Sequence, residues 1–213
     1  MNYIAETLGE DVLQDWDNFF ENRLLDYYTT KEKLVGEWFA FDRSPGDINW
    51  VAVDANEAAV SPAVQLAINN TRLGMVLRSL RQQYVFVGCL VGPGMQGNPY
   101  NLPAVDLYIV NIYDKTAQRW LNASELTTFV GRIANNPYGK RYKAGPIIGL
   151  IEFKTHLNAV NDLPDGNSDT TLIEDQLLSS LDMLTDLPSL VNPAMTRQGV
   201  ICSGLYGYTF NYS

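Results

Sequence analysis

The segment from Gly92 to Gly97 has the glycine spacing of a dinucleotide-binding loop, and it follows a strand-like run of apolar residues. In such a loop a helix begins among the glycines, so that its N-terminus faces a pyrophosphate. Here Pro99 and Pro103 follow, and they block a helix because proline has no backbone N–H to donate. The segment is therefore predicted to be a rigid surface loop that binds no cofactor.

His156 is the single histidine, so any Ser-His or Cys-His catalytic system would have to use it. No nucleophile motif accompanies it, and Cys89 and Cys202 each lie in a strand-like run rather than at a helix start. Both cysteines are predicted to be buried free thiols. Metal sites built from several histidines or from four cysteines are excluded by the residue counts. We therefore predict no catalytic residue and no metal ligand.

The segment from Asp165 to Asp169 carries oxygen ligands at alternate positions, as a calcium loop does. Thr170 and Gln176 stand where that pattern requires glycine and glutamate. A looser calcium site that also uses Asp162 and Glu174 is an alternative. The preferred interpretation is a solvated turn that leads into a helix.

A basic segment stands out in a chain whose net charge is −9. It interleaves three bases with two tyrosines, namely Tyr138, Lys140, Arg141, Tyr142 and Lys143. Three interpretations remain open: a solvated loop, a contact with an acidic neighbouring subunit, and a contact with nucleic acid. The overall acidity disfavours nucleic acid as the partner.

Aromatic residues alternate along the segment from Gly199 to Tyr212, which is predicted to be one strand. Alternation puts four of them on one face, namely Tyr206, Tyr208, Phe210 and Tyr212. This face either belongs to the core or completes the sheet of a neighbouring subunit. Together with the basic segment, these residues form the candidate interface.

Hydrophobic periodicity predicts the remaining elements. Thr7 and Glu10 form a capping box for a helix over about 8–28. A hairpin over 33–41 and 48–54 follows, and one or two helices then lie after Ser61. Strands are predicted over 84–91, 105–113 and 147–153, and helices over about 122–135 and 171–185. The result is a single α+β domain over 1–213, with a mixed or mostly antiparallel sheet of about six strands and three to four helices.

The chain shows neither a secretory signal nor an apolar run that could span a membrane. The expected location is the virion if the protein is viral, and otherwise the cytoplasm. The chain has 18 asparagines and 12 tyrosines but only six lysines, a composition that suits surfaces in contact with other proteins.

The order of elements resembles that of small tailed-phage virion proteins of the neck and tail-completion type. The resemblance rests on the capped first helix, the hairpin, the sheet, the helix over Thr171–Leu184 and the final strand. It implies a structural protein of the phage neck or tail, a ring-forming homo-oligomer that packs against other structural subunits and is not an enzyme.

Two other function classes remain as alternatives. One is a carboxylate-dependent hydrolase with its site in the loops over 92–103 and 158–169. The other is an acidic inhibitor or binding module that acts on a host protein. It would use Glu10, Asp11, Asp15 and Asp17.

Overall fold

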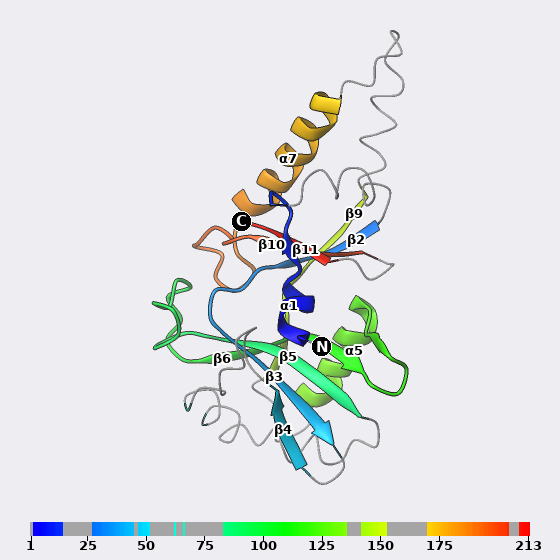
Figure 1. Ribbon diagram of the computed structural model, residues 1–213. Coiled ribbons are helices and arrows are strands. Elements are labelled where there is room, and N and C mark those ends of the chain that lie inside the picture. Colours follow the sequence, from blue (N-terminus) through cyan, green and yellow to red (C-terminus); the bar gives the residue numbers. More distant parts are fainter. Residues whose placement is uncertain are drawn as a thin grey trace. The chain divides into compact units, whose positions relative to one another are not determined.

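The computed structural model describes residues 2–14, 27–44, 47–51, 62, 66, 83–135, 142–152, 170–204 and 209–213 (Figure 1). The chain divides into two compact units, and each is built from two separate stretches of sequence. Unit 1 combines Met1–Thr7 with Leu34–Pro146, and unit 2 combines Leu8–Lys33 with Ile147–Ser213. That the whole chain is a single domain stays a prediction.

Unit 1 contains a six-stranded sheet in the order β4-β3-β5-β6-β7, with β8 beside β6. The β6–β8 pair is parallel and the other pairs are antiparallel. The strands are β3 (Glu37–Ser44), β4 (Asp47–Val51), β5 (Tyr84–Val91), β6 (Asp106–Asp114), β7 (Arg119–Trp120) and β8 (Tyr142–Ala144). Two helices, α1 (Tyr3–Leu8) and α5 (Ala123–Ala134), belong to the same unit.

Helix α5 begins with a capping box formed by Asn122 and Glu125. The Asn122 side chain accepts a hydrogen bond from the Glu125 N–H at 3.0 Å, and the Glu125 carboxylate accepts one from the Asn122 N–H at 2.9 Å. Three apolar residues at helical spacing, Leu126, Val130 and Ile133, are then buried in the core cluster of unit 1. The sheet contributes stacked rings to that cluster, with the Phe41 and Phe86 centroids 5.0 Å apart.

Unit 2 contains a five-stranded sheet in the order β1-β11-β10-β2-β9. Only β1 and β11 pair in parallel; the other pairs are antiparallel. The strands are β1 (Glu10–Asp11), β2 (Tyr27–Glu32), β9 (Ile147–Glu152), β10 (Val200–Gly204) and β11 (Thr209–Tyr212), and the helix is α7 (Thr170–Asp186). One face of this sheet carries the buried pair Tyr28 and Phe210, whose ring centroids lie 5.1 Å apart.

The prediction of a helix over 8–28 is wrong at both ends. Helix α1 ends at Leu8 because Gly9 takes a φ of +71°, and a Cβ there would lie 2.2 Å from the Thr209 carbonyl oxygen. The chain then pairs as β1 and returns as β2 from Tyr27, while 15–26 lie outside the described residues. Thr7 is a buried residue inside α1 and caps nothing.

The single strand predicted over 199–212 is also wrong. It is a hairpin of β10 and β11, in which Cys202 pairs with Phe210. The α+β class with a mixed sheet is confirmed, although the strands form two sheets. The hairpin β3–β4, the strands β5, β6 and β9 and the helices α5 and α7 also match their predictions. Most of the helical region predicted after Ser61 lies outside the described residues.

Within the part of the chain that the structure describes, no helix is both long and apolar enough to cross a membrane. The prediction of buried, free cysteines is confirmed.

Burial raises the pKa of both the Cys89 and the Cys202 thiol, so neither forms the reactive thiolate readily. We expect neither to react with Ellman's reagent at pH 8 in the native protein, whereas both react in denaturant. Rapid reaction of one equivalent in the native protein would show that one cysteine is accessible.

Candidate active site

The register of the unit 2 sheet puts two lysines on one face. Ile201 of β10 pairs with Lys31 on one side and with Asn211 on the other. The next residue to share this face is Lys33, whose N–H donates to the Gly199 carbonyl oxygen at 2.9 Å. Lys31, Lys33 and Asn211 therefore lie on the face opposite to Tyr28 and Phe210.

The amine of Lys33 is held by two uncharged acceptors. Its Nζ donates to Asn211 Oδ1 at 2.8 Å and to Ser213 Oγ at 3.1 Å. The Asn211 amide is itself oriented, because its Nδ2 donates to the Gly9 carbonyl oxygen at 3.1 Å. These contacts fix the Lys33 amine at a defined position on the face.

The Lys33 side chain also depends on a glycine. Gly199 has a φ of +144°, and a Cβ built there would lie 3.2 Å from Lys33 Cδ and 2.6 Å from the Tyr212 carbonyl oxygen. The absence of a side chain at Gly199 thus leaves room for the Lys33 stem beside β10.

Partial burial lowers the pKa of Lys33, and the nearby charge of Asp11 offsets part of this effect. At a given pH, more of the Lys33 amine is neutral than in a fully solvated lysine. A neutral amine with a free lone pair is a nucleophile, and desolvation is one of the ways in which enzymes activate lysine. Lys33 is therefore the candidate reactive group of unit 2.

Lys31 lies on the same face and is 5% exposed. Burial lowers its pKa from 10.5 to about 8. Between these two pH values the unfolded chain binds more protons at this lysine than the folded chain, so stability rises with pH. The full effect is about 3 kcal/mol, from 1.36 kcal/mol for each pKa unit.

We therefore expect wild type to gain up to about 3 kcal/mol of unfolding free energy over Lys31→Met between pH 8 and pH 10.5. Urea unfolding of both proteins at several pH values across this window measures the difference. Other titrating groups are common to both proteins and cancel. A difference that stays constant with pH would contradict a lowered pKa at Lys31.

The intervening residue, Glu32, has a structural role on the opposite face. Its buried carboxylate accepts hydrogen bonds from Ser189 Oγ at 2.6 Å and from the Leu190 N–H at 2.7 Å. These bonds tie the segment that leads into Gly199 to strand β2. Glu32 thus helps to place the glycine that accommodates Lys33.

The basic part of the candidate interface lies only partly within the described residues. Lys143 is exposed at the end of unit 1, where its Nζ pairs with Asp106 Oδ2 at 2.6 Å and lies 5.5 Å from the Tyr108 ring centroid. Tyr142 belongs to β8 and pairs in register with Leu107. Tyr138, Lys140 and Arg141 fall outside the described residues.

The aromatic part of the candidate interface is divided between core and surface. Phe210 is fully buried, whereas the Tyr212 hydroxyl donates to Asp182 Oδ1 of α7 at 2.5 Å. Tyr206 and Tyr208 fall outside the described residues. The same holds for the segment around His156 and for the calcium-like loop that precedes α7.

Solved structures of an RNA ligase from Naegleria gruberi have the same architecture. A glutamate-to-alanine variant with ATP and Mn gives a TM-score of 0.71 at 22% identity, and a lysine-to-methionine variant with AMP and Mn gives 0.70 at 22%. The same ligase with pyrophosphate gives 0.69 at 22%. The chain shares the fold of these ligase structures. In all three comparisons the match covers 96% of this chain and 54% of the ligase chain.

No protein-family model matches the sequence, and no curated protein matches it either. The likeness therefore consists of the RNA-ligase fold, and this chain spans about half of the ligase's length.

This fold corrects the functional interpretation of the sequence. The resemblance to phage neck and tail-completion proteins was wrong, and so was the prediction of a structural virion protein that is not an enzyme. The two alternatives, a hydrolase and an acidic inhibitor, are overturned by the same finding. The order of elements misled because two of those it used, the long first helix and the single last strand, do not exist as predicted.

Several of the ligase structures contain manganese. Among the described residues, no three of His, Cys, Asp and Glu gather closely enough to hold a metal ion. The Lys33 amine contacts an amide and a hydroxyl, which are weak ligands for a divalent cation, and Asp11 is the one carboxylate whose charge is found to act on this amine. The described part of the site does not fit a protein-held metal.

The sequence analysis missed Lys33 because it ended a helix at about residue 28, assigned no element to 29–32 and began a strand at Lys33 itself. A signal was present: Lys31 and Lys33 alternate within a strand-forming segment of an acidic chain that has six lysines in all. Alternation would have placed both amines on one face. The acceptors Asn211 and Ser213 carry no comparable signal.

Proposed function

We propose that this chain is a nucleotidyltransferase of the RNA-ligase type, in which the Lys33 amine accepts AMP from ATP. The observation that carries the proposal is an oriented lysine amine of lowered pKa on a sheet of the RNA-ligase fold. Because a fold alone does not define an activity, the argument depends on this amine. The ligase structures with ATP, AMP and pyrophosphate support the choice of nucleotide, since transfer of AMP from ATP releases pyrophosphate.

The proposed step balances as a simple substitution at phosphorus. Lys33 first loses a proton to solvent, and the lone pair on its neutral Nζ attacks the α-phosphorus of ATP. A nitrogen–phosphorus bond forms as the bond between the α-phosphorus and its bridging oxygen breaks. Pyrophosphate leaves with the electron pair, and AMP stays on the lysine. Asn211 Oδ1 and Ser213 Oγ hold the amine in position for this attack.

The acceptor that we propose for the AMP group is the end of an RNA strand. The basis is that the structures with this fold are named RNA ligases. Since the chain covers 54% of the ligase, sealing of RNA is a proposal for the protein as a whole.

The test is incubation of the purified chain with ATP labelled at the α-phosphate, in the presence and absence of Mn²⁺. The protein is not precipitated with acid before analysis. We expect the label to remain on the protein during denaturing electrophoresis and pyrophosphate to be released. Mass spectrometry should find an AMP adduct on the peptide that contains Lys33. The absence of any adduct, or an adduct on another residue, would refute the proposal.

A further inference from the structure

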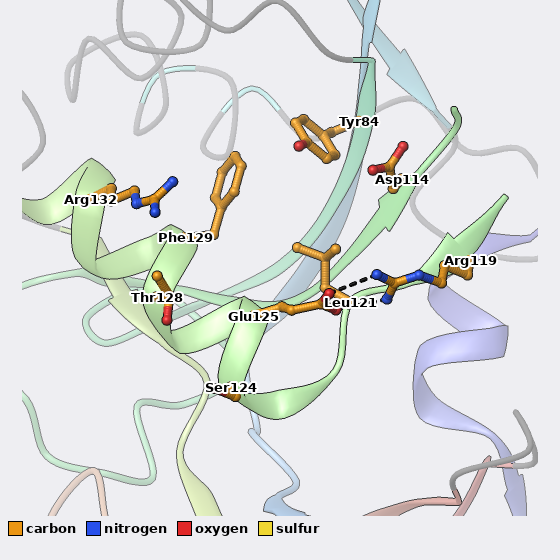
Figure 2. Close-up of a pocket in the computed structure, with 9 residues that line it drawn as sticks. All are labelled: Tyr84, Asp114, Arg119, Leu121, Ser124, Glu125, Thr128, Phe129 and Arg132. Carbon is orange, nitrogen blue, oxygen red and sulfur yellow. Dashed lines mark hydrogen bonds and ion pairs between the residues drawn. The ribbon is translucent and has the colours of Figure 1, made fainter. Parts of the chain in front are cut away.

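Unit 1 contains a pocket of about 400 Å³ beside helix α5. Its volume lies within the range of small-ligand sites in proteins. Figure 2 shows Phe129 and Arg132 projecting from α5, with Tyr84 of β5 and Asp114 of β6 on the other side. The pocket thus combines an apolar aromatic wall with charged groups at its rim.

The two acidic groups of the pocket are already engaged. Glu125 accepts two hydrogen bonds from Arg119, at 2.6 and 2.7 Å, and a third from the Asn122 N–H. These contacts lower the pKa of Glu125 to about 2. The Asp114 carboxylate accepts from the N–H groups of Thr116 and Ala117 at 2.8 and 3.0 Å.

Arg119 is paired with Glu125, whereas Arg132 has no such partner among the described residues. It is exposed on α5, and among the described residues it has neither a hydrogen-bond partner nor an ion-pair partner. Its guanidinium therefore supplies a positive charge and five donors that the pocket does not use internally. A phosphate group is the ligand that suits such a fork of donors.

The aromatic wall lies one turn of α5 before Arg132. The Phe129 ring packs edge-to-face against the buried Tyr84 ring, with centroids 5.0 Å apart, and remains only partly buried itself. Leu121 extends the apolar wall. A partly exposed phenyl ring next to an unpaired arginine is the combination that binds a base by stacking and its phosphate by charge.

We propose that this pocket binds one nucleotide of a single-stranded RNA, with the base against Phe129 and the phosphate on Arg132. The choice of RNA over other anionic ligands rests on the proposed function. The pocket would hold the substrate strand, whereas the chemistry takes place at Lys33.

The first test measures binding of a fluorescent, single-stranded RNA of ten nucleotides as a function of salt, for wild type, Arg132→Gln and Lys143→Gln. Both variants remove one exposed positive charge of unit 1, but Lys143 is paired with Asp106 and lies outside the pocket. For single strands, each lost phosphate contact reduces the slope of log K against log salt by about 0.7. We expect this reduction for Arg132→Gln and no change for Lys143→Gln. Equal slopes for the two variants would overturn the proposal.

The second test uses Phe129→Leu, which keeps an apolar side chain in the core but removes the ring. Loss of stacking is expected to weaken RNA binding about tenfold, with the thermal midpoint measured to confirm folding. Free AMP is the comparison ligand. AMP that competes with RNA at equal concentration would show that the pocket binds a free nucleotide and would overturn the RNA assignment.

Failure of the pocket assignment can be distinguished from failure of the proposed AMP transfer to Lys33. Arg132→Gln is expected to leave AMP labelling of Lys33 at the wild-type level when no RNA is present. If Lys33 is never labelled while RNA binding still depends on Arg132, the proposed function fails and the pocket assignment stands.

Discussion

Replacing Lys33 with arginine is expected to reduce AMP transfer to background while the protein remains folded. Arginine keeps the positive charge and can still bond to Asn211 Oδ1. However, its guanidinium stays protonated at all accessible pH values and has no lone pair that could attack phosphorus. The measurement is the amount of label retained on the protein after incubation with α-labelled ATP. A Lys33→Arg protein that is still labelled on the same peptide would show that another group is the nucleophile.

Two controls sharpen this experiment. Lys143→Arg makes the same substitution at an exposed, ion-paired lysine of unit 1 and is expected to leave labelling unchanged. The pH dependence of labelling gives independent support, because the pKa of Lys33 is lowered by burial. The rate should rise with pH as the amine loses its proton, with a midpoint below the ordinary lysine pKa of 10.5. A midpoint at or above 10.5 would contradict the burial effect.

Gly199→Ala is expected to destabilise the protein by about 2 to 4 kcal/mol, from backbone strain and crowding together. The φ of +144° at Gly199 is one that residues with a side chain rarely adopt, and the new Cβ would lie 2.6 Å from the Tyr212 carbonyl oxygen and 2.9 Å from Ser213 Cβ. Since Lys33 Cδ is also within 3.2 Å of that Cβ, AMP labelling should fall as well. Urea unfolding and the labelling assay measure the two effects.

Gly131→Ala is the matched control for this substitution. Gly131 lies inside α5, and a Cβ there would have no neighbour within 4 Å. Because alanine favours a helix over glycine, this variant should be more stable than wild type by up to about 1 kcal/mol. A similar loss of stability in both variants would mean that the geometry at Gly199 is not the cause.

Local sequence patterns predicted the elements whose causes are themselves local. A helix was predicted over about 122–135, and α5 begins after Asn122 as its N-cap; the apolar run from Tyr84 to Val91 forms the fully buried strand β5. The helix over 8–28 failed because its termination depends on tertiary structure. Gly9 approaches the Thr209 backbone closely, and β1 pairs with β11 at the other end of the sequence. No periodicity in a short window can report such a pairing.

The candidate site could not be assembled from the sequence for the same reason. The hydrogen bond between Lys33 and Asn211 joins residues separated by 178 positions, and Ser213 lies 180 positions from Lys33. The alternation of Lys31 and Lys33 was visible, but the lowered pKa of each comes from burial, which the fold alone creates. In contrast, the interpretation of Gly92–Gly97 as a loop without a helix needed only the two prolines, and the structure has turns there.

The division of the chain into two units has a consequence for how the molecule reaches its native state. All strands of the unit 1 sheet come from one continuous stretch between Glu37 and Ala144, whereas the unit 2 sheet joins strands from both sides of that stretch. Closing a long loop costs entropy, and this cost falls once the intervening chain is compact. We therefore expect unit 1 to acquire its order early and to bring β2 and β10 within reach of each other. The arrangement of Lys33, Asn211 and Ser213 would then form late in folding.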